Sequence, residues 1–305
     1  MDSSFDFQEL REYAFGIVDA GMVKQLPEGV FAQPLVPKRL TQSAHLMPTL
    51  IDLRCIPLVR LTVLLHSLTE ACENGEPPAI ALFIKSDSSA MEIARRWNAM
   101  QLAQPRLGRK VWLRLHDPRV LHQLLRILDP MQRPKLFGSS QAFIYWVGGG
   151  WVLATRALSP ESCTQAHKNG EVLPYAGPAR WDWSRIERIG AINRALLGAG
   201  INEASALISQ GALAEKLIEH AVVRHELLEL PDLIEFAIRG LQTNPVFDQH
   251  PEVARAIRPR GNTVGDSRLA DRFALVDEQV WASLRHSINL PRESRDDFCN
   301  QVRVL

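Results

Sequence analysis

One polar cluster in the sequence has the residue types that catalysis or ligand recognition needs. Arg114, His116, Asp117 and Arg119 lie close together in the chain. An imidazole beside a carboxylate can move protons, and guanidinium groups bind anions. The cluster follows an alternating stretch at residues 111–115, which predicts a strand, and ligands of α/β folds gather where strands end. One interpretation is therefore a recognition or catalytic cleft around these four side chains.

The same residues also have a structural interpretation. Asp117 followed by Pro118 is a helix-start signal, because the carboxylate accepts from free amides of the first turn and proline there sacrifices no hydrogen bond. Asp117 would then pair with Arg114 or Arg119 and fix the turn. We favour this interpretation because the Asp-Pro start alone accounts for the residue types. The sequence predicts that Asp117 matters more for folding than for chemistry.

Other chemistries find little support in the sequence. His116 and His122 are separated by a strand end, and His220 and His225 lie five apart, off a common helix face. Glycines 148–150 join two predicted strands instead of preceding a phosphate-binding helix, and no serine lies in a nucleophile elbow. The cysteines lack the paired spacing of a zinc site or redox dithiol; they are Cys55, Cys72, Cys163 and Cys299. We therefore expect no metal, no cofactor and no enzyme activity.

The elements that position the cluster are predicted to form an α/β lobe at residues 1–157. Its predicted strands are 13–18, 48–53, 79–84 and 111–115, with helices after Pro57, Ser88, Asp117 and Asp129. The run 79–84 is apolar on both faces, as in a central strand, and its connection through a helix to 111–115 predicts a parallel, right-handed crossover. A terminal β-hairpin of residues 142–147 and 151–155 completes a mixed sheet with helices.

The second half of the chain differs from the first in composition and in hydrophobic periodicity. Residues 158–182 are rich in Ser, Pro, Gly and Asn, which predicts a linker. Beyond it every periodic segment is helical, including one long helix at 269–284 and a small helix at 298–302. The weakly polar segments 227–238 and 269–284 are the expected walls of a partner surface, and residues 183–305 are predicted to form an all-α lobe. Its amphipathic stripes suit a groove for a partner helix. The expected partner surface comprises Phe236, Leu241, Phe273 and Trp281.

Composition and charge limit the partners. The 305 residues are 46% hydrophobic, which is enough for a substantial core. Because 35 Lys and Arg balance 34 Asp and Glu, no global field attracts nucleic acid or anionic membrane. The N-terminal segment has neither the basic region nor the apolar core of an export signal, and no apolar run reaches the roughly 18 residues that span a bilayer. We expect a cytoplasmic protein with no nucleic-acid or membrane partner.

The polar cluster also carries a family resemblance. The order of motifs resembles the type VI secretion effector-chaperone (adaptor) family, first catalogued only as a domain of unknown function; these motifs are LHDPRVL at 115–121, a leucine helix, Leu128-Asp129-Pro130 and Phe137-Gly138. Similar patterns occur at 13–19, 47–53, 231–239, 244–248 and 250–251. The family's usual glycine-proline after a double phenylalanine is replaced here by LFGS at 136–139.

The resemblance implies a non-catalytic adaptor that binds a cognate secreted effector, a toxin, and helps to load it onto the VgrG spike. Such a chaperone would cover apolar surface that the effector exposes before delivery. The motif residues would then be structural or would contact a partner; they are Arg114, His116, Asp117, Arg119, Asp129, Phe137 and Gly138. The alternative is an enzyme of unknown chemistry with an inter-lobe cleft around the first three of these. A weaker alternative is an immunity-type protein that neutralises a toxin.

Overall fold

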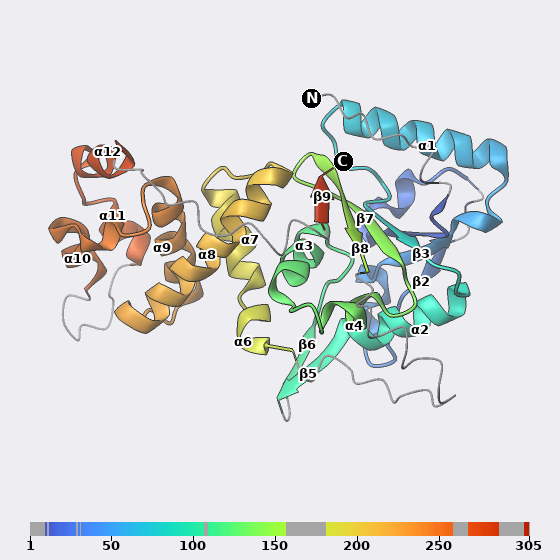
Figure 1. Cartoon of the computed structure of the whole chain (residues 1–305), viewed down its shortest axis with the longest axis horizontal. Helices are drawn as coiled ribbons and strands as arrows, with labels where there is room; N and C mark the ends of the chain where they lie inside the picture. Colours follow the sequence, from blue (N-terminus) through green and yellow to red (C-terminus); the bar gives the residue numbers. More distant parts are fainter. Residues whose placement is uncertain are drawn as a thin grey trace. The chain divides into compact units, whose positions relative to one another are not determined.

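The computed structural model describes residues 10, 12–28, 30, 32–106, 109–156, 181–258, 268–286 and 302–304. The chain divides into two compact units (Figure 1): unit 1 comprises residues 1–186 and 295–305, and unit 2 comprises residues 187–294. The predicted order, a sheet lobe with helices followed by a helical region, is confirmed. Residues 158–180 of the predicted linker lie outside the described residues.

Unit 1 is built on a seven-stranded sheet with the order β2-β3-β1-β4-β7-β8-β9. The strands are β1 (Phe15–Val18), β2 (Ala32–Pro34), β3 (Thr49–Asp52), β4 (Leu82–Lys85), β7 (Ala142–Val147), β8 (Gly150–Thr155) and β9 (Val302–Val304). Every strand pair among the described residues is antiparallel. The central strands β1 and β4 are almost wholly buried, which explains why their sequences are apolar on both faces.

The expected parallel crossover between residues 79–84 and 111–115 is wrong. Strand β4 lies between β1 and β7, while β6 (Arg109–Trp112) pairs with β5 (Leu102–Arg106) in a separate two-stranded sheet. The physical reason is proximity in the chain. Strand β5 directly precedes β6, so an antiparallel ribbon closes a much shorter loop than a crossover would.

Unit 1 contains both 3-10 helices and α-helices in addition to its sheet. The 3-10 helices are η2 (Ala20–Gln25), η3 (Thr41–Leu46) and η4 (Leu53–Cys55); the α-helices are α1 (Leu58–Glu73), α2 (Ala90–Gln101), α3 (Pro118–Ile127), α4 (Arg133–Phe137) and α6 (Trp183–Ile186). The predicted helix after Pro57 is confirmed. Helix α2 begins with a capping box between Ser89 and Glu92. Leu64 and Leu68 of α1 are the buried side chains that join this helix to the core.

Unit 2 is a helical assembly. It contains α7 (Ile189–Gly198), α8 (Ala204–His225), α9 (Leu230–Gln242), η6 (Phe247–Gln249), α10 (Pro251–Ile257), α11 (Leu269–Phe273) and α12 (Glu278–His286). Gly240 of α9 packs directly against Leu217 of α8, an approach that only a residue without a side chain allows. The single long helix expected at 269–284 is wrong, because the chain turns after Phe273 and Asp277 caps α12 by accepting from the amide of Gln279 at 2.8 Å.

Strand β9 was not predicted from the sequence. Residues 302–304 pair with β8, with Val304 opposite Val152 and Val302 opposite Ala154. The expected all-helical region 183–305 is therefore interrupted by a strand, and the chain returns to unit 1 after unit 2. The short helix expected near Val302 is replaced by this edge pairing, because Val302 and Val304 alternate as a strand requires. No described helix has the length and apolar character that would cross a membrane.

Candidate functional site

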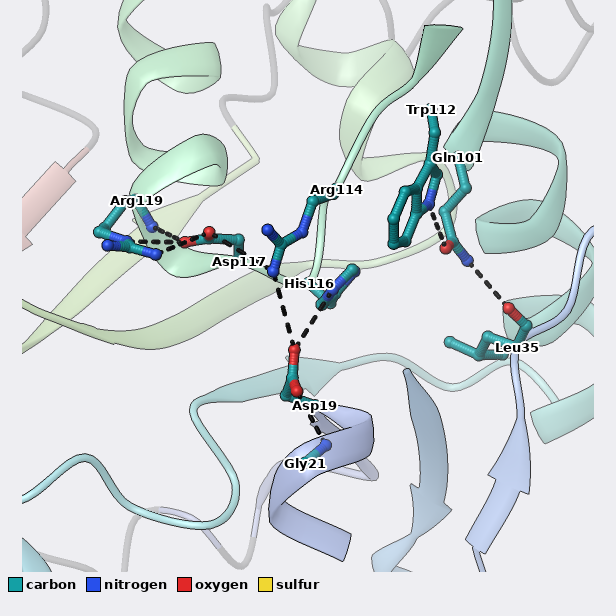
Figure 2. Close-up of polar contacts among 9 residues, drawn as sticks. All are labelled: Asp19, Gly21, Leu35, Gln101, Trp112, Arg114, His116, Asp117 and Arg119. Carbon is teal, nitrogen blue, oxygen red and sulfur yellow. Dashed lines mark hydrogen bonds and ion pairs between the residues drawn. The ribbon is translucent and has the colours of Figure 1, made fainter. Parts of the chain in front are cut away.

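Three segments bring the polar cluster together (Figure 2). Asp19 follows β1 and caps η2, with its Oδ1 accepting from the amide of Gly21 at 2.9 Å. Arg114 and His116 lie in the connection between β6 and α3, and Asp117 is the N-cap of α3 as the sequence predicts. The sequence reasoning did not assign Asp19 to this site. The feature of the sequence that could have identified Asp19 is its position directly after the apolar segment 15–18.

Asp117 is held firmly by Arg119. Its Oδ1 accepts from the Arg119 amide and from Nε, both at 3.1 Å, and its Oδ2 accepts from an Arg119 terminal nitrogen at 3.0 Å. Burial by itself raises the pKa of Asp117, but the hydrogen bonds and the charge of Arg119 outweigh burial and lower that pKa below its ordinary value. Asp117 therefore stays ionised, and one side chain both caps the helix and neutralises a guanidinium.

His116 is the buried member of the cluster. Its side chain is 1% exposed and stacks on Trp112 with the ring centroids 5.9 Å apart. Nε2 lies 3.5 Å from Oδ2 of Asp19, too far for a strong hydrogen bond, and Nδ1 has no hydrogen-bond partner among the described residues. Burial, aided by the charge of Arg114, lowers the pKa of His116 to about 4 despite the nearby carboxylates. This imidazole is neutral at pH 7.

Arg114 makes looser contacts. A terminal nitrogen lies 4.0 Å from Oδ2 of Asp19 and 4.0 Å from Oδ2 of Asp117, and the guanidinium carbon lies 5.8 Å from the ring centroid of Trp112. Figure 2 shows Arg114 between the two carboxylates. Its side chain is 48% exposed. Ion pairs of this length contribute little to stability when they are exposed to solvent. The Arg114 guanidinium is therefore available to a partner.

A second layer holds Trp112 in place. Its indole nitrogen donates to Oε1 of Gln101 at 3.4 Å, and the Gln101 amide donates to the carbonyl of Leu35 at 3.3 Å. Gln101 is fully buried. Trp112 in turn supports His116 and Arg114. The chain of contacts from Leu35 to His116 explains why a polar glutamine is kept inside unit 1.

The chemistry that this arrangement favours is ion pairing. His116 is neutral and enclosed, so it is poorly placed to exchange a proton with a bound molecule. The groups that face solvent are Asp19, Arg114 and Arg119, which carry charges of both signs. Such a set suits recognition of a charged protein surface and the fixing of the β6–α3 turn.

The three downstream motif residues build connections instead of joining the cluster. Oδ1 of Asp129 accepts from the amides of Met131 and Gln132, each at 2.8 Å, and so shapes the turn before α4. Phe137 is buried and stacks on Phe143 with centroids 4.4 Å apart. Gly138 ends α4 with φ at 61°, a conformation that favours glycine.

The predicted partner residues of the helical region lie mostly inside unit 2. Phe236, Phe273 and Trp281 are buried, with Phe273 and Trp281 in edge contact at 5.4 Å, and Leu241 is half-buried. In this structure the three aromatic residues form core and not surface. A partner surface on the helical unit stays a prediction. Among the described residues of unit 2, the exposed large apolar side chains are Leu197, Val223, Leu228, Leu230, Val246 and Leu275.

The expectation that His220 and His225 point apart is wrong. Their Nε2 atoms lie 2.9 and 2.8 Å from the same oxygen, Oδ2 of Asp248. Residues five apart lie on different faces only within a regular helix, and His225 is the last residue of α8. Asp248 lies in η6 and contacts both imidazole rings. The signal in the sequence is an aspartate directly after an aromatic residue, Phe247. The structure shows both of them buried.

The sequence reasoning also missed an apolar surface on α1. Leu58, Val59 and Val63 are 65%, 77% and 54% exposed. Leu58 also lines a hollow of about 250 Å³, together with Leu10, Tyr13, Leu53, Arg54, Ile56, Leu61 and Leu65. We call this area the α1 surface. Its signal is the start of the helix, LVRLTVLL, which carries apolar residues around more of the helix than one buried stripe needs.

Comparison with known proteins gives one match. Residues 18–135 match the model of a family described as Domain of unknown function (DUF4123). The matched part contains Asp19, Arg114, His116, Asp117 and Arg119, and it covers none of unit 2. The downstream patterns that suggested a resemblance at 231–251 are outside it. No curated protein and no solved structure matches the chain.

Proposed function

We propose that the protein is a non-catalytic adaptor of a bacterial type VI secretion system, which binds a cognate effector in the cytoplasm and assists its loading onto the VgrG spike. The match at residues 18–135 supports this proposal, because that family is known in contexts associated with type VI effectors. An adaptor needs surfaces for two partners and no reaction centre. The charged and apolar surfaces of unit 1 fit that requirement.

The observation that carries the proposal is the α1 surface. Leu58, Val59 and Val63 are exposed on α1, and Leu58 also lines the apolar hollow. A partner whose apolar side chains cover the helix and enter the hollow would bury both surfaces. Full burial of a valine or leucine side chain contributes roughly 1.5–3 kcal/mol. Apolar side chains gathered around a hollow are a feature of protein interaction sites.

The extent of the family match suggests how the two partners are divided. Helix α1 lies within the matched residues, whereas unit 2 lies outside them. A spike contact would be common to adaptors, and an effector contact would be individual to each. We therefore assign the α1 surface to the spike and the exposed apolar side chains of unit 2 to the effector.

The test uses the full chain with two alternative surface changes. Val59→Lys combined with Val63→Lys places charges on the α1 surface without touching the buried Leu64 and Leu68. The matched control is Val223→Lys in unit 2, where valine is 74% exposed. Each protein is coexpressed with the spike protein and the toxin encoded beside it, and copurification is measured.

The α1 variant should lose the spike, keep the toxin and melt at the parent temperature, while the control keeps the spike. If the folded α1 variant retains the spike in full, the assignment of α1 is wrong. If the parent chain copurifies with neither neighbour, the adaptor function itself is wrong.

A further inference from the structure

The histidine pair of unit 2 and the aspartate between them form a compact group of metal-ligand atoms. The donor atoms of His220, His225 and Asp248 all lie within 4.8 Å of one another. Both imidazoles direct Nε2 at the same carboxylate, at 2.9 and 2.8 Å. The two rings meet edge to face, with their centroids 5.5 Å apart. Three ligands from two separate segments thus converge on one point.

The Asp248 carboxylate is buried, and only one of its two oxygens has a hydrogen-bond partner among the described residues. The Asp248 side chain is 2% exposed, its Oδ2 accepts from both histidines, and its Oδ1 has no hydrogen-bond partner among the described residues. A buried carboxylate with one oxygen unpaired is costly, and a cation bound to that carboxylate offsets the cost by neutralising its charge. This unpaired oxygen is evidence for a ligand that is independent of the clustering of the histidines.

The surroundings suit an ion that enters from one side. Phe236 packs against both imidazoles, at centroid distances of 6.0 Å from His220 and 5.4 Å from His225, and it is fully buried. The protein side of the cluster is therefore apolar and holds the rings in place. His220 is 36% exposed, which leaves a path from solvent and room for a water ligand.

We propose that His220, His225 and Asp248 bind a divalent transition metal, with Zn²⁺ as the best fit. Two imidazoles and one carboxylate are typical ligands of zinc sites that keep a position for water, whereas Mg²⁺ and Ca²⁺ prefer oxygen ligands throughout. The charge of the carboxylate offsets half that of the ion.

The present distances are close to what such a site needs. Zinc ligands at about 2.0–2.1 Å in a tetrahedron lie about 3.4 Å from one another. The two histidine–aspartate distances must therefore lengthen by about half an ångström, and the imidazoles must close on the same point. Small rotations of the side chains accomplish both changes. The ion then takes the place of the two protons that the histidines now share with Asp248.

The site would join the end of α8 to the segment that follows α9. His225 is the last residue of α8, and Asp248 lies in η6, which precedes α10. Metal ions that connect separate segments stabilise the folded state, since the unfolded chain does not assemble the ligands. The proposal does not depend on the adaptor function.

The experiment measures metal binding by the full chain. Chelator-treated protein is titrated with Zn²⁺ by calorimetry, bound zinc is counted after dialysis, and Co²⁺ serves as a probe whose visible spectrum reports its ligands. The test variant is His220→Gln, because its partly exposed ring can be replaced with little risk to folding. Asp248→Asn is a second variant that keeps the size of the carboxylate. The control is His66→Gln in unit 1, where the histidine is 73% exposed.

We expect one zinc ion per chain, a higher melting temperature with zinc, and a loss of affinity of about 100-fold or more in His220→Gln. The His66→Gln control should bind like the parent. If the parent retains no zinc, or if His220→Gln binds as tightly as the control, the proposal is wrong and the three residues form only a hydrogen-bonded clamp. If Asp248→Asn fails to fold, His220→Gln decides the result alone.

Discussion

Arg119 holds Asp117 through two hydrogen bonds of nearly equal length, one from Nε to Oδ1 at 3.1 Å and one from a terminal nitrogen to Oδ2 at 3.0 Å. The same Oδ1 also accepts from the first-turn amide of α3. One carboxylate therefore accepts three hydrogen bonds at the start of this helix. We therefore expect removal of this carboxylate to reduce the stability of the fold more than it changes the binding of a partner.

We expect Asp117→Ala to lower the free energy of unfolding by about 1–2 kcal/mol, since loss of an N-cap costs about 1 kcal/mol and loss of the partly buried ion pair with Arg119 adds about 1 kcal/mol. Asp117→Asn keeps an oxygen for the cap and should lose less. Urea unfolding compares the three proteins, and partner binding is measured on the same preparations. An alanine variant with parental stability and no partner binding would instead support the functional interpretation of the cluster.

Stability should depend on the protonation of His116. Its pKa is about 4 in the folded protein and 6.5 when unperturbed, so below pH 6.5 the unfolded chain binds a proton that the folded chain refuses. The stabilisation present above pH 6.5 is lost as the pH falls towards 4. At roughly 1.4 kcal/mol per pKa unit, the full loss is about 3 kcal/mol.

His116→Gln removes this titration, and His66→Gln serves as the exposed control. Unfolding is measured at several pH values between 6.5 and 4.5. The difference in stability between the parent and His116→Gln should shrink with falling pH. A difference that stays constant over this range would show that His116 is not the responsible group.

Gly240→Ala tests the close packing of α8 and α9. Alanine is favoured over glycine in a helix by about 1 kcal/mol, but a methyl group here would meet the side chain of the buried Leu217 well inside contact distance. Overpacking costs about 1–3 kcal/mol, so we expect a lower melting temperature. Gly190→Ala is the matched control, because its methyl group meets only Arg194 at 3.7 Å and should not destabilise. Equal effects of the two changes would contradict the packing argument.

Exchange of unit 2 tests where effector specificity lies. We expect a chimera with residues 187–294 from a related adaptor to bind the relative's toxin and to keep the spike of this protein. The reason is that unit 2 lies outside the matched residues, whereas α1 lies within them. Copurification with each toxin measures the outcome. Continued binding of the original toxin would place recognition in unit 1.

Features set by neighbouring residues were predictable from the sequence. The Asp117 cap, the hairpin at Gly148 and Gly149, and the helix after Pro57 depend on local dihedral angles and hydrogen bonds, so short patterns predict them. The positive φ of the hairpin glycines, 60° and 75°, matches the turn that was expected.

Features that depend on distant partners were not predictable. A strand was expected at 111–115, whereas β6 occupies 109–112 and pairs with β5 instead of β4. Periodicity indicates which face of a sheet a side chain lies on, but not which strand lies beside it. Asp19 contacts His116, and Asp248 contacts His220. Each pair is far apart in the sequence, and motif spacing predicts contacts only between residues that are close in the sequence. The exposure of Val59 on α1 likewise depends on what packs against the helix.

The pairing of β9 with β8 has a consequence for the order in which the protein is made. A ribosome completes β1 to β8 and then all of unit 2 before residues 302–304 emerge. Until then, the nascent sheet exposes the edge of β8 with unpaired amide and carbonyl groups, which is a site for pairing with other chains. Closure of that edge therefore waits until unit 2 has been made, so a chain stalled inside unit 2 would be prone to aggregation.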